Sequence, residues 1–143
     1  MNRYNTGAPG DEQFEPGSDK TVLRNKLGVT DLAEVGRIEA SLLAVAQARS
    51  FLHIETETPI SVGLIKTLHR SWLGSLYDFA GNIRTIDLAK DSVTFAPVAY
   101  IENTLGDLDQ LLSRLTPCQG MSEGELVQAI ARVHAELLLA HPF

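Results

Sequence analysis

The chain of 143 residues has the length of one ordinary domain, and its 44% hydrophobic and 21% charged residues are typical of a globular protein. Its 12 basic and 18 acidic residues give a net charge of −6, which excludes the basic surface that attracts nucleic acids or anionic membranes. Apolar runs such as 42–46 are far shorter than the roughly 18 residues of a membrane span. Because Cys118 is the only cysteine, no internal disulfide is possible, and a cytoplasmic location is expected.

The first part of the chain lacks hydrophobic periodicity. Residues 1–20 combine glycine, proline and acidic side chains, which predicts a mobile N-terminal arm, with Tyr4 and Phe14 as candidate anchors to the domain. Residues 21–27 are then expected to form a short helical turn that ends at Gly28. The domain itself is predicted to span residues 21–143.

Two helices are predicted in the first half of this domain. Apolar residues recur at helical spacing from Asp31 to about Leu52, and Thr30 is the expected N-cap. A second helix is predicted to follow Ser61 and to be interrupted at Gly74, because its apolar positions fall on one face.

Two more helices are predicted in the second half. One begins near Tyr100 and stops at Pro117, since proline disfavours helical geometry at the residue before it. The other opens with a capping box formed by Ser122 and Glu125 and runs to about His141. Helical period is lost between residues 76 and 98, where turn residues mix with short alternating stretches, so we predict a β-hairpin, or flap, over about 84–98. The expected fold class is therefore mainly α with one small β-hairpin.

The histidines do not form a metal-binding pattern. His134 and His141 lie on one helix but are separated by roughly 10 Å along its axis, so they cannot share one ion. The sequence contains no H-E-x-x-H spacing, and neither a Walker loop nor a G-x-G-x-x-G motif is found. We expect no metal site.

His141 is the most promising chemical group. Because Pro142 follows it, the helix should end there and present the imidazole at its C-terminus. A histidine at this position either caps the helix or acts as a general base, and residue chemistry alone leaves both roles open, with capping the commoner.

Three segments resemble the Fic family. The ending A-E-L-L-L-A-H-P-F, residues 135–143, resembles the helix and first three letters of the Fic signature HPFx[D/E]GNGR. The segment L-Y-D-F-A-G-N-I-R-T, residues 76–85, is similar to the one that these proteins carry ahead of a target-binding flap, and its order and spacing agree. The stretch 14–31 resembles the N-terminal region of bacterial Fic proteins. The resemblance covers nearly the whole chain.

The resemblance implies a protein adenylyltransferase, which transfers AMP from ATP to a Tyr, Ser or Thr hydroxyl of a protein target. His141 matches the general base of that reaction, and Pro142 and Phe143 match motif positions with a structural role. The flap would register an extended target segment by main-chain hydrogen bonds, with Thr94 and Phe95 as its contact positions. The residues alone favour the alternative, an ordinary surface hairpin whose Phe95 covers the core. Asn82 and Arg84 stay open between turn chemistry and substrate contact.

The signature is interrupted after Phe143. The acidic magnesium ligand, the Gly-Asn-Gly anion loop and the arginine of the family pattern are absent from these residues, as is the helix that usually follows. We therefore expect a partial Fic domain that does not itself bind the ATP and magnesium implied by the resemblance, and that is inactive alone. The alternatives are a non-catalytic Fic fragment that binds a partner, or a phosphotransferase relative.

An inhibitory segment is also considered. Thr30 and Glu34 have the spacing of the family's [S/T]xxxE[G/N] motif, but Val35 replaces the Gly or Asn. An N-cap and a first-turn acid explain these residues more economically. A separate small antitoxin is therefore a possible partner.

Overall fold

The computed structural model describes residues 5–6, 13–90, 93–116 and 118–143. Within them the chain is mainly helical with a small antiparallel sheet, as the sequence predicts. The elements, in chain order, are β1 (Asn5–Thr6), α1 (Leu32–His53), α2 (Val62–Leu73), β2 (Leu88–Lys90), β3 (Val93–Thr94), α3 (Val98–Leu115) and α4 (Glu123–Ala140).

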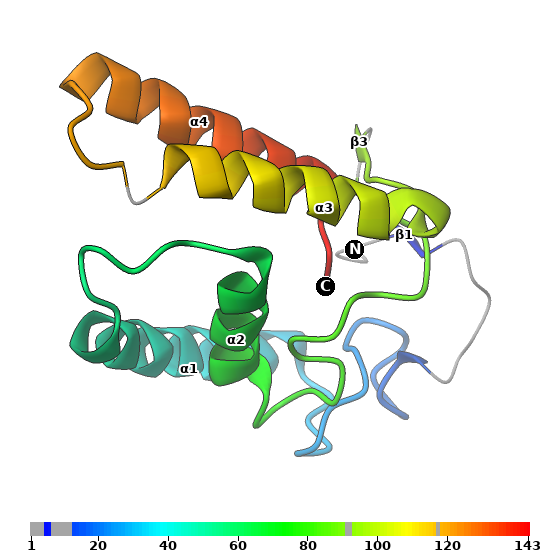
Figure 1. Ribbon diagram of the computed structural model, residues 1–143. Helices are drawn as coiled ribbons and strands as arrows, with labels where there is room; N and C mark the ends of the chain where they lie inside the picture. The colour runs from blue at the N-terminus through cyan, green and yellow to red at the C-terminus, as the bar shows by residue number, and fades with distance from the viewer. Residues whose placement is uncertain (1–4, 7–12, 91–92, 117) are drawn as a thin grey trace.

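The helices form two pairs. In Figure 1, α3 and α4 lie side by side across the top, α1 and α2 lie below them, and the C-terminus descends between the pairs. The buried face of α3 contributes Ile101, Leu105, Leu108 and Leu112 to a core that also contains Ala140 of α4. A second buried cluster lies where α2 ends, and it consists of Leu73, Leu76, Tyr77 and Ala80. The end of α4 is therefore anchored in the main core.

The helix ends follow the capping chemistry read from the sequence, with one correction. The Ser61 side chain accepts a hydrogen bond from the Leu64 N–H and caps α2. Ser122 and Glu125 form the predicted capping box at the start of α4. The N-cap of α1 is Asp31 rather than Thr30, because the Asp31 carboxylate accepts from the Glu34 N–H at 2.7 Å. Either residue type can cap a helix, and the backbone path selects which one does.

The predicted hairpin is present. Strands β2 and β3 pair antiparallel, with Ala89 opposite Thr94 and Lys90 opposite Val93. β1 pairs antiparallel with the other side of β2, so the strand order is β1-β2-β3 and β3 lies at an edge of this sheet. The Asp87 carboxylate accepts a hydrogen bond from the Val98 N–H, which joins the base of the hairpin to the start of α3.

The short helical turn predicted over residues 21–27 does not form. Instead, Leu23 makes an antiparallel bridge with Phe14. The buried Asn25 side chain donates to the Val29 carbonyl and accepts from the Val29 N–H, so it organises the loop that ends before α1. Asparagine side chains that bond nearby backbone groups compete with helix formation, and these local bonds of Asn25 explain the error.

The predicted N-terminal arm is only partly described. Tyr4 and the rest of residues 1–4 and 7–12 lie outside the described residues. Nearer the domain, the Glu15 N–H donates to the Val22 carbonyl at 2.8 Å, and Ser18 is buried. Whether the arm as a whole is mobile stays a prediction.

Candidate functional site

His141 lies immediately after α4, where the helix was predicted to end. It is the C-cap residue, with φ 37° and ψ 66° in the left-handed region. Its imidazole is stacked on the Phe95 ring, with ring centroids 4.2 Å apart. Phe95 directly follows β3 and is buried, so the end of α4 and the end of the hairpin meet through these two rings.

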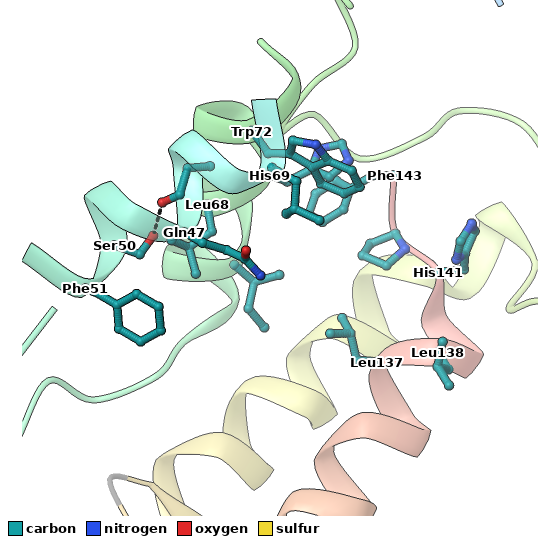
Figure 2. A pocket seen from close by; sticks show the side chains of 14 residues that line it. Gln47, Ser50, Phe51, Leu68, His69, Trp72, Leu137, Leu138, His141 and Phe143 are labelled. Atoms are coloured by element: carbon teal, nitrogen blue, oxygen red, sulfur yellow. Dashed lines mark hydrogen bonds between the residues drawn. The ribbon is translucent and has the colours of Figure 1, made fainter. Parts of the chain in front are cut away.

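Phe143 packs on the opposite side of the terminal segment, which consists of residues 141–143. Its ring is stacked on His69 of α2 at 4.1 Å, and His69 in turn meets the edge of Trp72 at 6.0 Å. Figure 2 shows Phe143 lying against His69 and Trp72, while His141 is directed away from this cluster. Phe143 thus occupies an inward position, and Pro142 between the two aromatic residues is buried. The structural roles of Pro142 and Phe143 in a signature motif stay a prediction.

His69 is a half-buried histidine with a defined partner. Its Nδ1 atom accepts a hydrogen bond from the Gly81 N–H at 2.9 Å, which leaves the proton of the neutral ring on Nε2. Burial, and secondarily the charge of His141, lowers the pKa of His69 from its ordinary 6.5. His69 is therefore held mainly as neutral imidazole beside the terminal segment.

Arg84 connects the end of α4 to the hairpin. Its guanidinium donates to the carbonyls of His141 and Ile86, each at 2.7 Å, and also to the carbonyls of Ala140 and Ala96. Burial lowers the pKa of Arg84, and the Asp87 carboxylate opposes that effect. This buried guanidinium is committed to backbone oxygens, which resolves the role that the sequence left open.

A cavity of about 510 Å³ lies between α1, α2 and the terminal segment. Figure 2 shows its walls, which include Phe51 and Leu68 on one side and Leu137 and Leu138 on the other, while the Phe143 ring lies against α2. These side chains are apolar, and no lysine or arginine lines the cavity among the described residues. Within the described residues, the ionisable side chains that line the cavity are His69 and His141, so it offers a phosphate group no permanently charged side chain.

The two predicted flap positions differ in exposure. Thr94 is exposed on β3, whereas Phe95 is buried against His141. The open edge of β3 carries Val93, which is 48% exposed. An extended segment could pair with this edge, and that role stays a prediction.

The structure adds two residues near residues 141–143 that the sequence does not point to, His69 and Gly81, and it places Arg84 against the His141 backbone. Gly81 has a φ of +76°, and a Cβ there would lie 2.8 Å from the Lys66 carbonyl oxygen and from the Arg70 Cβ. The letters A-G-N-I-R, residues 80–84, belong to the segment 76–85 that resembles the family. The contacts of this stretch with His69 of α2 and with His141 join positions more than ten residues apart, so no periodic pattern in the sequence indicates them.

The described residues do not suit a metal ion. Across residues 5–6, 13–90, 93–116 and 118–143, no three His, Cys, Asp or Glu side chains gather closely enough to ligate one. None of the helices within these residues has the length and hydropathy needed to cross a bilayer.

Comparisons with known proteins now add to this geometry. Residues 59–143 match the sequence profile of the Fic/DOC family. The "Protein adenylyltransferase VbhT" of Bartonella schoenbuchensis is 32% identical over 124 residues, which cover 85% of this chain and 25% of the relative. The "Probable protein adenylyltransferase Fic" of Escherichia coli strain K12 is 27% identical over 139 residues, covering 96% of this chain and 66% of the relative.

The fold is also found in solved structures. The BepC effector of Bartonella tribocorum, crystallised with bound AMPPNP, superposes with a TM-score of 0.76 at 22% identity, over 92% of this chain and 68% of that one. At this identity the likeness shows the fold. The chain spans a quarter of the length of the first curated relative and about two thirds of the second.

Proposed function

This chain belongs to the Fic/DOC family, and on that premise we propose that it carries the general base and the target-binding hairpin of a protein adenylyltransferase. The proposed base is His141, and the proposed target is a protein segment that presents a Tyr, Ser or Thr hydroxyl. The names of the two curated relatives support the reaction class.

One observation carries the proposal: the His141 ring is stacked on Phe95, the residue that follows the edge strand β3. An extended peptide that pairs with β3 would run beside the imidazole. Strand addition of this kind gains affinity from main-chain hydrogen bonds and does not depend on one target sequence. The exposed Thr94 and Val93 would then face the added strand or its side chains.

In the proposed reaction, His141 accepts the proton of the target hydroxyl as the oxygen attacks the α-phosphorus of ATP. A new oxygen–phosphorus bond forms, the bond to the bridging oxygen breaks, and diphosphate leaves. A histidine suits this role because its ordinary pKa lies near neutral pH. The backbone of this proposed base is bonded to Arg84, and its ring is stacked on Phe95, which supports a fixed position for the imidazole.

The described residues do not fit magnesium or the phosphates of ATP. The part of the chain that the structure describes holds no cluster of three carboxylates or other metal-binding side chains, and the Arg84 guanidinium is already bonded to backbone oxygens. No step is therefore assigned to the metal. We propose that residues outside these 143 hold the nucleotide and the ion, and that the 143-residue polypeptide alone transfers no AMP.

The proposal is tested with a chimaera in which residues 1–143 replace the matched segment of the Escherichia coli relative, which supplies the remaining third of its own chain. The chimaera is incubated with a bacterial lysate and ATP labelled on its α-phosphate. Labelled protein is expected, and His141→Ala should abolish it. His134→Ala is the matched control, because His134 is exposed on the same helix. Undiminished labelling by a folded His141→Ala chimaera would refute the role of His141 as base.

The same assay addresses the two other expectations. The 143-residue polypeptide should label nothing above a heat-killed sample. Label transferred from the γ-phosphate rather than the α-phosphate would identify the chain as part of a phosphotransferase relative.

A second candidate function, partner binding without catalysis, is favoured by the exposed apolar side chains near the cavity. Phe51 is 85% and Leu52 80% exposed at the end of α1. Exposed apolar groups of this size are typical of surfaces that contact another protein. A small antitoxin is one such partner, and a cytoplasmic location would suit the free Cys118. Retention of the chain by a candidate partner, lost in Phe51→Ser, would support this function.

A further inference from the structure

Arg84 is the most extensively bonded side chain near His141. It is 8% exposed, and its guanidinium donates to four backbone carbonyls. Two of these belong to the end of α4, Ala140 and His141, and two flank the hairpin, Ile86 and Ala96. The Arg84 backbone N–H adds a fifth bond, to the Pro142 carbonyl at 2.8 Å. One residue therefore joins three chain segments at one place.

The chemistry of these acceptors calls for an arginine. The last carbonyls of a helix have no partner within the helix, and they carry the negative end of its dipole. A guanidinium offers five donors in a planar arrangement and keeps its charge when buried, whereas a lysine offers three donors from a single atom. A lysine at position 84, with three donors on one nitrogen, cannot reproduce all four of these bonds.

These bonds act on the backbone of His141, which is left-handed although the residue is not glycine. Such a conformation is held only where the surrounding structure enforces it. The His141 carbonyl is bonded to the Arg84 Nε atom at 2.7 Å. On the hairpin side, the Ala96 N–H donates to the Leu139 carbonyl at 2.9 Å, and the Ala96 carbonyl accepts from Arg84. Phe95 is consequently fixed over the His141 ring.

We infer that Arg84 is a positioning residue: it holds the His141 imidazole and the end of the hairpin in one fixed arrangement. The geometric part of this inference concerns the 143-residue chain by itself. The catalytic part rests on the proposed function. Misplacement of a catalytic group by about 1 Å can cost on the order of a hundredfold in rate. Arg84 would thus control the rate without touching the substrate.

The geometric part is tested by NMR on the 143-residue chain. The ring current of the stacked Phe95 changes the chemical shifts of the His141 ring protons, and the Phe95→Leu variant gives the chemical shifts of these protons in the absence of that ring. In the Arg84→Lys variant this ring-current contribution to the His141 chemical shifts should be lost. The Trp72 indole N–H, which donates to the Glu39 carbonyl, should keep the chemical shift that it has in the folded chain. The control is Arg114→Lys, since Arg114 also bonds a carbonyl but on its own helix. An Arg84→Lys chain that retains the His141 shift overturns the inference.

If the Arg84→Lys variant does not fold, the geometric part is tested on the unmodified chain instead. The Nε–H of Arg84 should exchange with solvent much more slowly than that of the exposed Arg114, and equal exchange rates overturn the inference. The catalytic part uses the chimaera: Arg84→Lys should lower kcat about tenfold or more with little change in KM for ATP. An unchanged kcat overturns this part. Activity absent from every chimaera would contradict the proposed function, while the NMR result still decides the geometry.

Discussion

Gly81 occupies a position that leaves no room for a side chain. Its φ of +76° disfavours other residues, and a Cβ would approach the Lys66 carbonyl oxygen to 2.8 Å. We predict that Gly81→Ala lowers the free energy of unfolding by roughly 2 kcal/mol or more, because left-handed strain and a backbone clash add. Urea unfolding monitored by circular dichroism measures this change.

The matched control for Gly81 is Gly106 in α3, where a Cβ meets nothing within 4 Å. Gly106→Ala should raise the free energy of unfolding by about 0.5–1 kcal/mol, since alanine is the better helix former. Equal effects of the two substitutions would show that Gly81 is not constrained as described.

His69 makes stability depend on pH in the acidic range. Its folded-state pKa lies below the ordinary 6.5 because of burial first and the His141 charge second. As the pH falls through about 6.5, the unfolded chain binds a proton that the folded chain resists, so the free energy of unfolding decreases until the pH passes the folded pKa. Above about 6.5 this contribution does not vary, because both states are neutral.

We predict that His69→Gln loses less stability than the unmodified chain when the pH is lowered from about 7.5 to 5. Glutamine removes the titrating group and keeps an oxygen that can accept from the Gly81 N–H. Urea unfolding across this range tests the prediction, with exposed His134→Gln as the control. Parallel pH profiles for the His69 variant and the unmodified chain would contradict it.

At the scale of elements, α2 is the helix that supports the terminal segment, and its start depends on one side chain. Ser61 caps α2 by accepting from the Leu64 N–H at 3.1 Å. We predict that Ser61→Ala costs about 1 kcal/mol of stability, because a helix N–H is left without its partner. Ser41→Ala in α1 is the control, since that hydroxyl is exposed and only donates to the Arg37 carbonyl. Thermal unfolding should separate the two variants, and equal melting temperatures would rule out the cap as a stabilising feature.

The hairpin is an element whose position depends on the rest of the fold. Its strands contain three and two residues, and two-stranded hairpins of this size are marginal alone. The Val98 N–H donates to the Asp87 carboxylate, and the Ala96 N–H donates to the Leu139 carbonyl. These two hydrogen bonds attach the hairpin to α3 and α4. The hairpin is thus placed by tertiary bonds at its base rather than by its own pairing.

At the scale of the molecule, the terminal apolar side chains are unevenly covered. Phe143 packs on His69, whereas Leu138 is 53% exposed and lines the same cavity as Phe51. Burying one such side chain is worth roughly 1.5–3 kcal/mol. We predict that the 143-residue chain self-associates with rising concentration, and that replacing Phe51 and Leu138 together by serine reduces the association.

Sedimentation velocity over a wide range of concentrations tests this prediction. Val127→Ser is the control, because Val127 is 60% exposed on α4 but does not line the cavity. A monomer at every concentration, with a high melting temperature, would mean that the apolar end is already adequately covered.

Local chemistry determined much of this protein before any tertiary contact was known. Apolar periodicity located the four helices, and the Ser122–Glu125 pair marked the start of α4 because capping is settled within one turn. Pro142 predicted the helix end at His141, since proline restricts the residue before it. The motif letters 76–85 and 141–143 identified the family. Each of these signals comes from residues that are close together in the chain, so it can be read from the sequence alone.

Only the tertiary structure decided what surrounds His141. The Arg84 guanidinium donates to four backbone carbonyls, among them that of His141, 57 positions away in the sequence. Phe95 met His141, and Phe143 met His69, through ring contacts between elements that no periodicity relates. Such contacts depend on how separately formed helices pack. The proposed base, His141, could therefore be selected from the sequence, whereas the residues that support it could be found only from the fold.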